Sequence, residues 1–115
     1  MNKNSEIYIE KTGDLLMITL SGDLNASLGG RLLEKLKTQM ERARDVILDL
    51  TDVDYLDSAG MGALVSIQMS TKRKGYRCIL AGLQGAPLEV MKSSQLLRIF
   101  QVQDSRQAAL DELER

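Results

Sequence analysis

The chain has 115 residues, of which 43% are hydrophobic and 27% are charged, which predicts one globular domain over residues 1–115. The 15 Lys and Arg residues and 16 Asp and Glu residues leave a net charge of −1, which argues against nucleic acid as a partner. With no histidine and one cysteine, the chain lacks what His-dependent catalysis, a His or Cys zinc site and an intrachain disulfide require. No metal site is expected.

Apolar stretches in the sequence are short. No run exceeds four residues, as in Leu15–Ile18, which falls far short of the ~20 residues that a membrane-spanning helix needs. The first ten residues contain no apolar segment of the signal-peptide type. The sequence therefore predicts a cytoplasmic protein with no membrane partner, and a monomer is the simplest expectation for the free protein.

The first half of the chain predicts strands around one helix. Ile7–Glu10 and Leu15–Leu20 are β-rich segments joined by a short polar connection suited to a hairpin. Val46–Leu50 is an apolar run between polar residues, typical of a strand buried on both faces. Between them, large apolar residues recur every four positions after a capping Asn25 or Ser27, which predicts an amphipathic helix.

The second half alternates helices with short strands. The expected elements are a helix over 59–74 preceded by Asp57 or Ser58, a strand over 76–81 with a buried Cys78, a helix from the turn of Pro87 to about Ser94, an apolar segment over 96–102 that can form a strand, and a final helix capped by Asp104. This order predicts an α/β fold with a mixed, mostly parallel sheet and crossover helices.

The densest polar stretch is Asp49–Gly62, expected as a loop between a buried strand and a helix, where α/β proteins often place their sites. A nucleotide loop is disfavoured because the Gly-Lys-Ser/Thr ending is missing. Cation binding lacks the EF-hand spacing, so a solvated acidic loop is the favoured interpretation of its aspartates. These aspartates are Asp49, Asp52, Asp54 and Asp57.

Ser58 offers a third possibility for this stretch. A serine at a helix N-cap points its hydroxyl at free N–H groups, where the helix dipole tolerates a phosphate. Phosphorylation would add roughly −1.5 to −2 charges beside Asp57 and so repel an acidic partner surface. From the residues alone, a plain helix cap is the favoured interpretation of Ser58, and a phosphoacceptor is the alternative.

A longer pattern changes that balance. Val46–Leu64 contains an apolar strand with an internal Asp, a short connection, Asp-Ser-Ala-Gly-Met and an apolar helix, and it resembles the signature of the bacterial anti-sigma-factor antagonists, the single-domain STAS proteins. Ser21–Asn25 is similar to the turn before that family's first helix, with Asn25 where many members carry Asp. The resemblance implies a STAS-like fold and makes the phosphoacceptor the favoured interpretation of Ser58.

The resemblance also implies partners and a mechanism. The unphosphorylated protein is expected to bind an anti-sigma serine kinase and thereby release the sigma factor. Phosphorylation of Ser58 by that kinase would end the binding, and a metal-dependent serine phosphatase would restore it. No cofactor or catalytic residue is implied. The implied partner-binding residues are Asp23, Leu24, Asn25, Ser27, Asp57, Ser58, Ala59, Gly60, Met61 and Gly62.

Other functions remain open at this stage. The same switch can regulate an output other than a sigma factor, or the chain can be a constitutive STAS subunit of a transporter complex in which Ser58 is never modified. A receiver domain would need an acidic pair after its first strand, which this sequence lacks. An enzyme is disfavoured because no nucleophile elbow or metal-ligand spacing is present.

Overall fold

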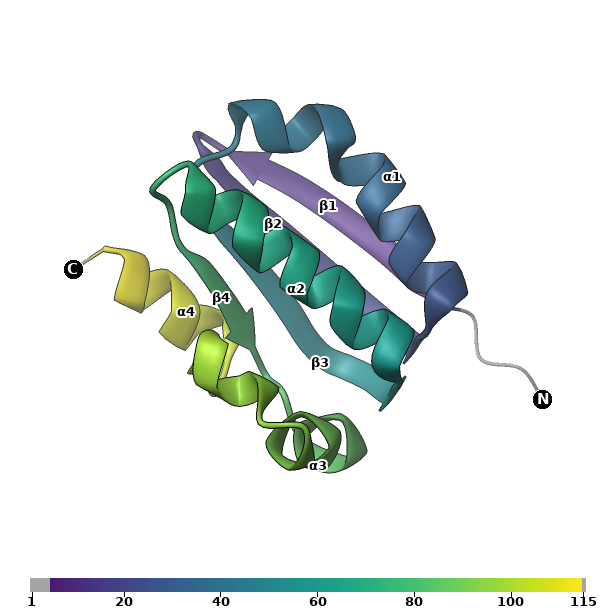
Figure 1. The fold of residues 1–115 in the computed structure, drawn as a ribbon. Coiled ribbons are helices and arrows are strands. Elements are labelled where there is room, and N and C mark those ends of the chain that lie inside the picture. The colour runs from purple at the N-terminus through teal and green to yellow at the C-terminus, as the bar shows by residue number, and fades with distance from the viewer. Residues whose placement is uncertain (1–4, 115) are drawn as a thin grey trace.

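In the computed structural model, which describes residues 5–114, a five-stranded sheet carries helices on both faces (Figure 1). The strands are β1 (Glu6–Thr12), β2 (Leu15–Leu24), β3 (Val46–Leu56), β4 (Cys78–Ala81) and β5 (Gln101–Gln103), and they lie in that order across the sheet. The β1–β2 pair is antiparallel and the other three pairs are parallel. The predicted α/β class with a mixed, mostly parallel sheet is confirmed.

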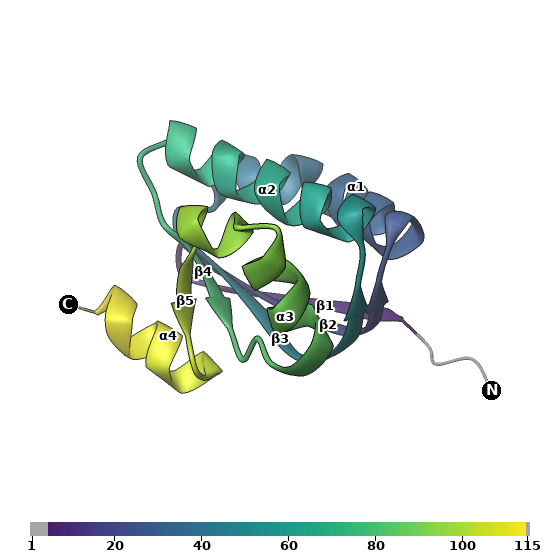
Figure 2. The ribbon, with the colours of Figure 1, turned by 60° about the horizontal axis from the view of Figure 1, so that its bottom comes forward.

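The helices form two unequal layers. They are α1 (Ala26–Arg42), α2 (Ser58–Arg73), α3 (Gly85–Ser93), the 3-10 helix η1 (Leu96–Ile99) and α4 (Arg106–Leu113). Seen along the sheet, α1 and α2 lie side by side on one face and α4 lies on the other (Figure 2). The two N-terminal ends of α1 and α2 therefore meet at the same end of the sheet.

Aliphatic side chains fill the space between α1, α2 and the sheet. Leu28, Leu32 and Leu36 of α1 are buried at the predicted spacing of four, and they share this core with Leu64 and Ile67 of α2. A smaller core under α4 holds Met17, Ile47, Ile79, Ala81 and Ala109. The sheet is thus covered on both faces, as parallel strands require.

Cys78 is buried at the start of β4, as predicted. Burial raises the pKa of its thiol to about 12, because the thiolate is poorly solvated there. The thiol is therefore protonated at neutral pH and unreactive.

The expected acidic loop is instead a strand. β3 continues to Leu56, and its pairing with β2 shifts twice, between Thr19 and Ser21 and between Gly22 and Asp23. At each shift β3 contains one extra residue, which is a β-bulge. The bulges let Leu50, Val53 and Leu56 reach the core at a spacing of three, which the alternation of a regular strand does not allow.

Asp49 is also not solvated, because only 8% of it is exposed. One carboxylate oxygen lies 3.1 Å from Nε of Arg106, and the other accepts hydrogen bonds from the backbone N–H and hydroxyl of Thr51. Arg106 also donates to the hydroxyl of Thr19. This buried, fully bonded group ties α4 to the sheet.

Two expectations for the C-terminal third are wrong in detail. The segment 96–102 forms η1 and only the first part of the three-residue β5, because Gln95, at φ 64°, turns the chain and Phe100 anchors it in the core. Ser105, and not Asp104, caps α4, since its hydroxyl accepts from the N–H of Ala108 at 3.1 Å.

Candidate functional site

A single residue, Asp57, separates β3 from α2. Its backbone is extended and its carboxylate Oδ1 accepts the N–H of Gly60 at 3.0 Å, so Asp57 is the N-cap of α2. Ser58 is therefore the first residue of the helix, and the interpretation of Ser58 as the cap is wrong. The side chain of Asp57 accepts the N–H of Gly60, the third helical amide, so the Ser58 hydroxyl does not form the capping hydrogen bond.

The hydroxyl of Ser58 faces solvent. Ser58 is exposed, and within residues 5–114 its side chain makes no hydrogen bond. The first amides of a helix have no intrahelical acceptor, and the helix dipole places partial positive charge among them. The chain thus presents an unbonded nucleophilic oxygen at a position that tolerates an added anion.

The connection between β2 and α1 lies against this helix start. The backbone carbonyl of Leu24 accepts the N–H of Asp57 at 3.4 Å. A Cβ added to Gly60 would come within 2.0 Å of the same carbonyl oxygen, so only glycine allows this approach. Asn25 caps α1, with its side-chain oxygen accepting the N–H of Leu28 at 3.1 Å. The N-termini of α1 and α2 are therefore held side by side.

The structure brings the sequence-predicted residues to one end of the sheet, with different exposures. Ser27, Ser58, Ala59 and Gly62 are exposed; Asp23, Asn25, Asp57 and Met61 are half-buried; Leu24 and Gly60 are buried. Asp23 and Leu24 end β2 and do not lie in a loop as expected. Gly60 packs against the backbone of Leu24, so it positions the helix and offers no open surface, whereas a side chain at position 62 would meet no atom within 4 Å.

Two residues that the sequence reasoning missed belong to this surface. Tyr55 is 50% exposed and pairs in register with Asp23. Ser94, after α3, donates its hydroxyl to the sulfur of Met61 at 3.5 Å, which brings the end of α3 to the first turn of α2. The signal for Tyr55 was an aromatic residue between two aspartates in a polar stretch.

The aspartates of β3 do not form a cation site. Asp49 is engaged with Arg106, and in the described part of the chain no group of three or more His, Cys, Asp or Glu side chains is arranged to hold a metal ion. What this end of the molecule offers is a surface with an acidic border around Ser58.

No helix among residues 5–114 is long and apolar enough to cross a bilayer.

Comparison with known proteins places the chain in a family. The STAS domain model matches residues 6–109. The chain is 30% identical over 105 residues to BtrV of Bordetella bronchiseptica, whose name describes it as an anti-sigma factor antagonist, with 90% of each chain covered. It is 29% identical over 103 residues to the anti-sigma-B factor antagonist of Listeria monocytogenes, covering 89% of this chain and 82% of that one.

A solved structure of similar fold is consistent with this family assignment. The phosphorylated form of the Bacillus cell fate determinant SpoIIAA superimposes with a TM-score of 0.75 at 19% identity, over 94% of this chain and 99% of that one. At this identity the likeness shows the fold. Together with the family model, it accounts for the sheet order and for the helices on both faces. The chain belongs to the STAS domain family.

Proposed function

We propose that this protein is an anti-sigma factor antagonist that binds a serine kinase acting as the anti-sigma factor, and that phosphorylation of Ser58 ends the binding. The observation that carries the proposal is the exposed, unbonded hydroxyl of Ser58 at the first residue of α2. The names of the relatives BtrV and the Listeria protein support the sigma-factor output. The protein acts as a binding module and substrate, not as an enzyme.

The surface around Ser58 suits close docking. Ala59 and Gly62 are exposed and small, so a partner backbone can approach the first turn of α2. Tyr55 and Met61 supply apolar area at its border. With the kinase docked here, the Ser58 oxygen attacks the γ-phosphorus of bound ATP, ADP leaves, and the hydroxyl proton passes to a base of the kinase.

The same geometry explains why phosphorylation would end the complex. The new group carries roughly −1.5 to −2 charges and replaces a small hydroxyl in a closely packed interface. It faces a kinase site built around nucleotide phosphates, so like charges meet where water is excluded. The carboxylate of Asp57 adds to the negative potential.

Restoring the binding-competent form requires only that a phosphatase can reach the phosphate on Ser58. Since Ser58 is exposed at a helix start, a metal-dependent serine phosphatase can reach the phosphoryl group without local unfolding. The cycle consumes ATP and acts on transcription, so we place it in the cytoplasm.

The proposal predicts that the purified protein, incubated with the anti-sigma serine kinase encoded in its own genome and ATP, gains one phosphoryl group on Ser58. Intact mass and fragment mapping measure this directly. Ser58→Ala should gain none, whereas Ser66→Ala, an exposed serine two turns further along α2, should behave as wild type. Phosphorylation of Ser58→Ala to the same extent would contradict the assignment, and an unmodified wild type would favour a constitutive subunit. A kinase that phosphorylates Ser58 but binds no sigma factor would indicate that the switch regulates an output other than a sigma factor.

A further inference from the structure

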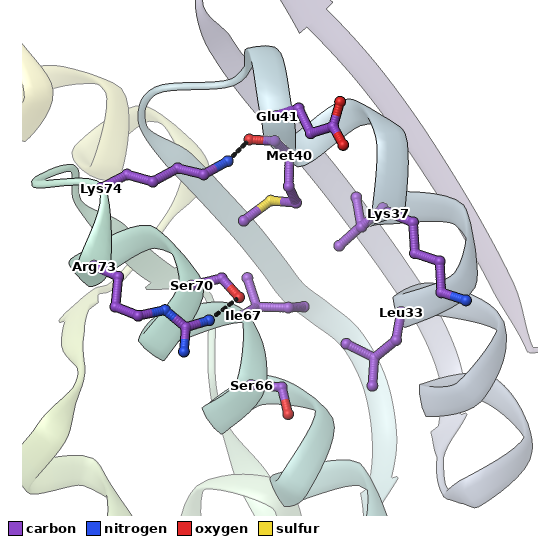
Figure 3. Close-up of a pocket in the computed structure, with 10 residues that line it drawn as sticks. Leu33, Lys37, Met40, Glu41, Ser66, Ile67, Ser70, Arg73 and Lys74 are labelled. Atoms are coloured by element: carbon purple, nitrogen blue, oxygen red, sulfur yellow. Dashed lines mark hydrogen bonds between the residues drawn. The ribbon is translucent and has the colours of Figure 1, made fainter.

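A groove of about 320 Å³ runs between the C-terminal halves of α1 and α2 (Figure 3). Its apolar lining comes from Leu33, Leu36 and Met40 of α1 and from Ile67 of α2. Leu36 and Ile67 are 2% exposed and form the floor. None of the residues that form the surface around Ser58 lines the groove.

Residue size explains why the helices part here. Near their N-terminal halves they touch, since a Cβ added to Gly29 would come within 3.1 Å of the Cβ of Ala63. Further along, α2 presents the small Ser66 and Ser70 opposite the long Leu33 and Met40. The serines leave space that the α1 side chains do not fill, as Figure 3 shows.

One end of the groove is positively charged. Arg73 donates to the hydroxyl of Ser70 at 3.3 Å, and the ammonium of Lys74 donates to the carbonyl of Met40. Within residues 5–114 neither cation forms an ion pair with a carboxylate. Glu41 is the acidic residue among those that line the groove, and Lys37 pairs with Glu34 outside it. The groove therefore combines an apolar floor with two cations, Arg73 and Lys74, that form no ion pair within the described residues.

The groove continues the proposed docking surface. Ser58, Gly62, Ser66 and Ser70 recur every four residues, so they form a strip that turns by about 40° per step around α2 from its first turn to the groove. Ser66 lies roughly 12 Å along the helix axis from Ser58, at about 1.5 Å per residue. A kinase docked on Ser58 is within reach of the groove.

We propose that the groove binds an amphipathic helix of the kinase partner, with apolar side chains between the two helices and acidic side chains beside Arg73 and Lys74. This inference rests on the proposed function, since it names how the same partner is held. A groove about two helical turns long fits apolar side chains spaced three or four residues apart. The unmatched cations select an acidic helix.

Two groove variants test this inference. The affinity of each unphosphorylated variant for the purified kinase is measured by calorimetry. Ser66→Trp fills the groove, and Arg73→Glu with Lys74→Glu reverses its charge. Each should weaken binding at least tenfold, and the charge reversal should also reduce its salt dependence. Matched controls at exposed positions outside the groove, Thr38→Trp and the pair Lys35→Glu with Lys72→Glu, should change binding less than threefold.

Cross-linking tests the identity of the occupant. Ser66→Cys can be labelled alone with a maleimide photocross-linker, because Cys78 is 3% exposed and its pKa is raised to about 12. The cross-link is expected on an acidic amphipathic helix of the kinase, with Thr38→Cys giving none there. A cross-link to a kinase loop, or to a second copy of this chain, would overturn the inference.

The two proposals fail separately. If Ser58→Asp abolishes binding while both groove variants bind as wild type does, the groove inference is wrong and the proposed function stands. If Ser58→Asp also binds as wild type does, the phosphorylation switch itself is wrong. Thermal melts that match wild type within a few degrees show that the variants are folded.

Discussion

Replacing Ser58 by aspartate is expected to weaken binding to the proposed serine kinase by roughly fivefold to 700-fold. One like-charge contact at ~4 Å costs about 1 to 4 kcal/mol between water-like and protein-surface dielectrics, and each 1.4 kcal/mol is about tenfold in affinity. The new carboxylate lies next to Asp57 in the sequence, and in the complex that we propose it would face the phosphates of the kinase-bound nucleotide. Calorimetry with the purified kinase measures the loss.

Charge must be separated from size in this experiment. Ser58→Asn has nearly the shape of Ser58→Asp without its charge, so it should retain most of the affinity, and Ser58→Ala should bind as wild type does. All three should melt close to wild type, because an acidic residue in the first turn is favoured by the helix dipole by about 0.3 to 1 kcal/mol. Equal losses for Asn and Asp would show that bulk and not charge ends the binding.

Replacing Gly60 by alanine is expected to destabilise the fold by about 2 to 3 kcal/mol or to displace the start of α2. The added Cβ would lie 2.0 Å from the Leu24 carbonyl oxygen and 2.9 Å from Cδ1 of Leu56, and the first of these is backbone that cannot rotate away. Chemical denaturation measures the loss. Because the contact sets the position of Ser58 relative to Asn25, kinase affinity should fall as well.

Gly62 provides the matched control on the same helix. An added Cβ there meets nothing within 4 Å, so Gly62→Ala should stabilise the protein by roughly 0.5 to 1 kcal/mol through helix propensity alone. A Gly60→Ala protein as stable as Gly62→Ala would show that the Leu24 contact is not tight.

The spacing of apolar residues and the capping residues were sufficient to predict the helices that depend on them. The spacing of four in Leu28, Leu32 and Leu36 predicted α1, and the helix expected over 59–74 after Asp57 or Ser58 matches α2. The predicted residues lie together because Asp57–Gly62 is contiguous and because β2 is paired with β3.

Long-range contacts explain the errors. The bulges that extend β3 depend on its pairing with β2, and the spacing of Leu50, Val53 and Leu56 fits no regular strand. The burial of Asp49 depends on Arg106, 57 residues away. Asp57 instead of Ser58 became the cap because β3 continues to the residue before it, which fixes where the helix begins.

The measurement that tests the central claim most directly is release of a labelled sigma factor from its complex with the serine kinase, followed by fluorescence anisotropy. Unphosphorylated protein should release the sigma factor in proportion to the amount added, and protein phosphorylated on Ser58 should release none over the same range. Equal release by the two forms would contradict a switch at Ser58, and a sigma factor that stays bound in the presence of either form would contradict the role of anti-sigma factor antagonist.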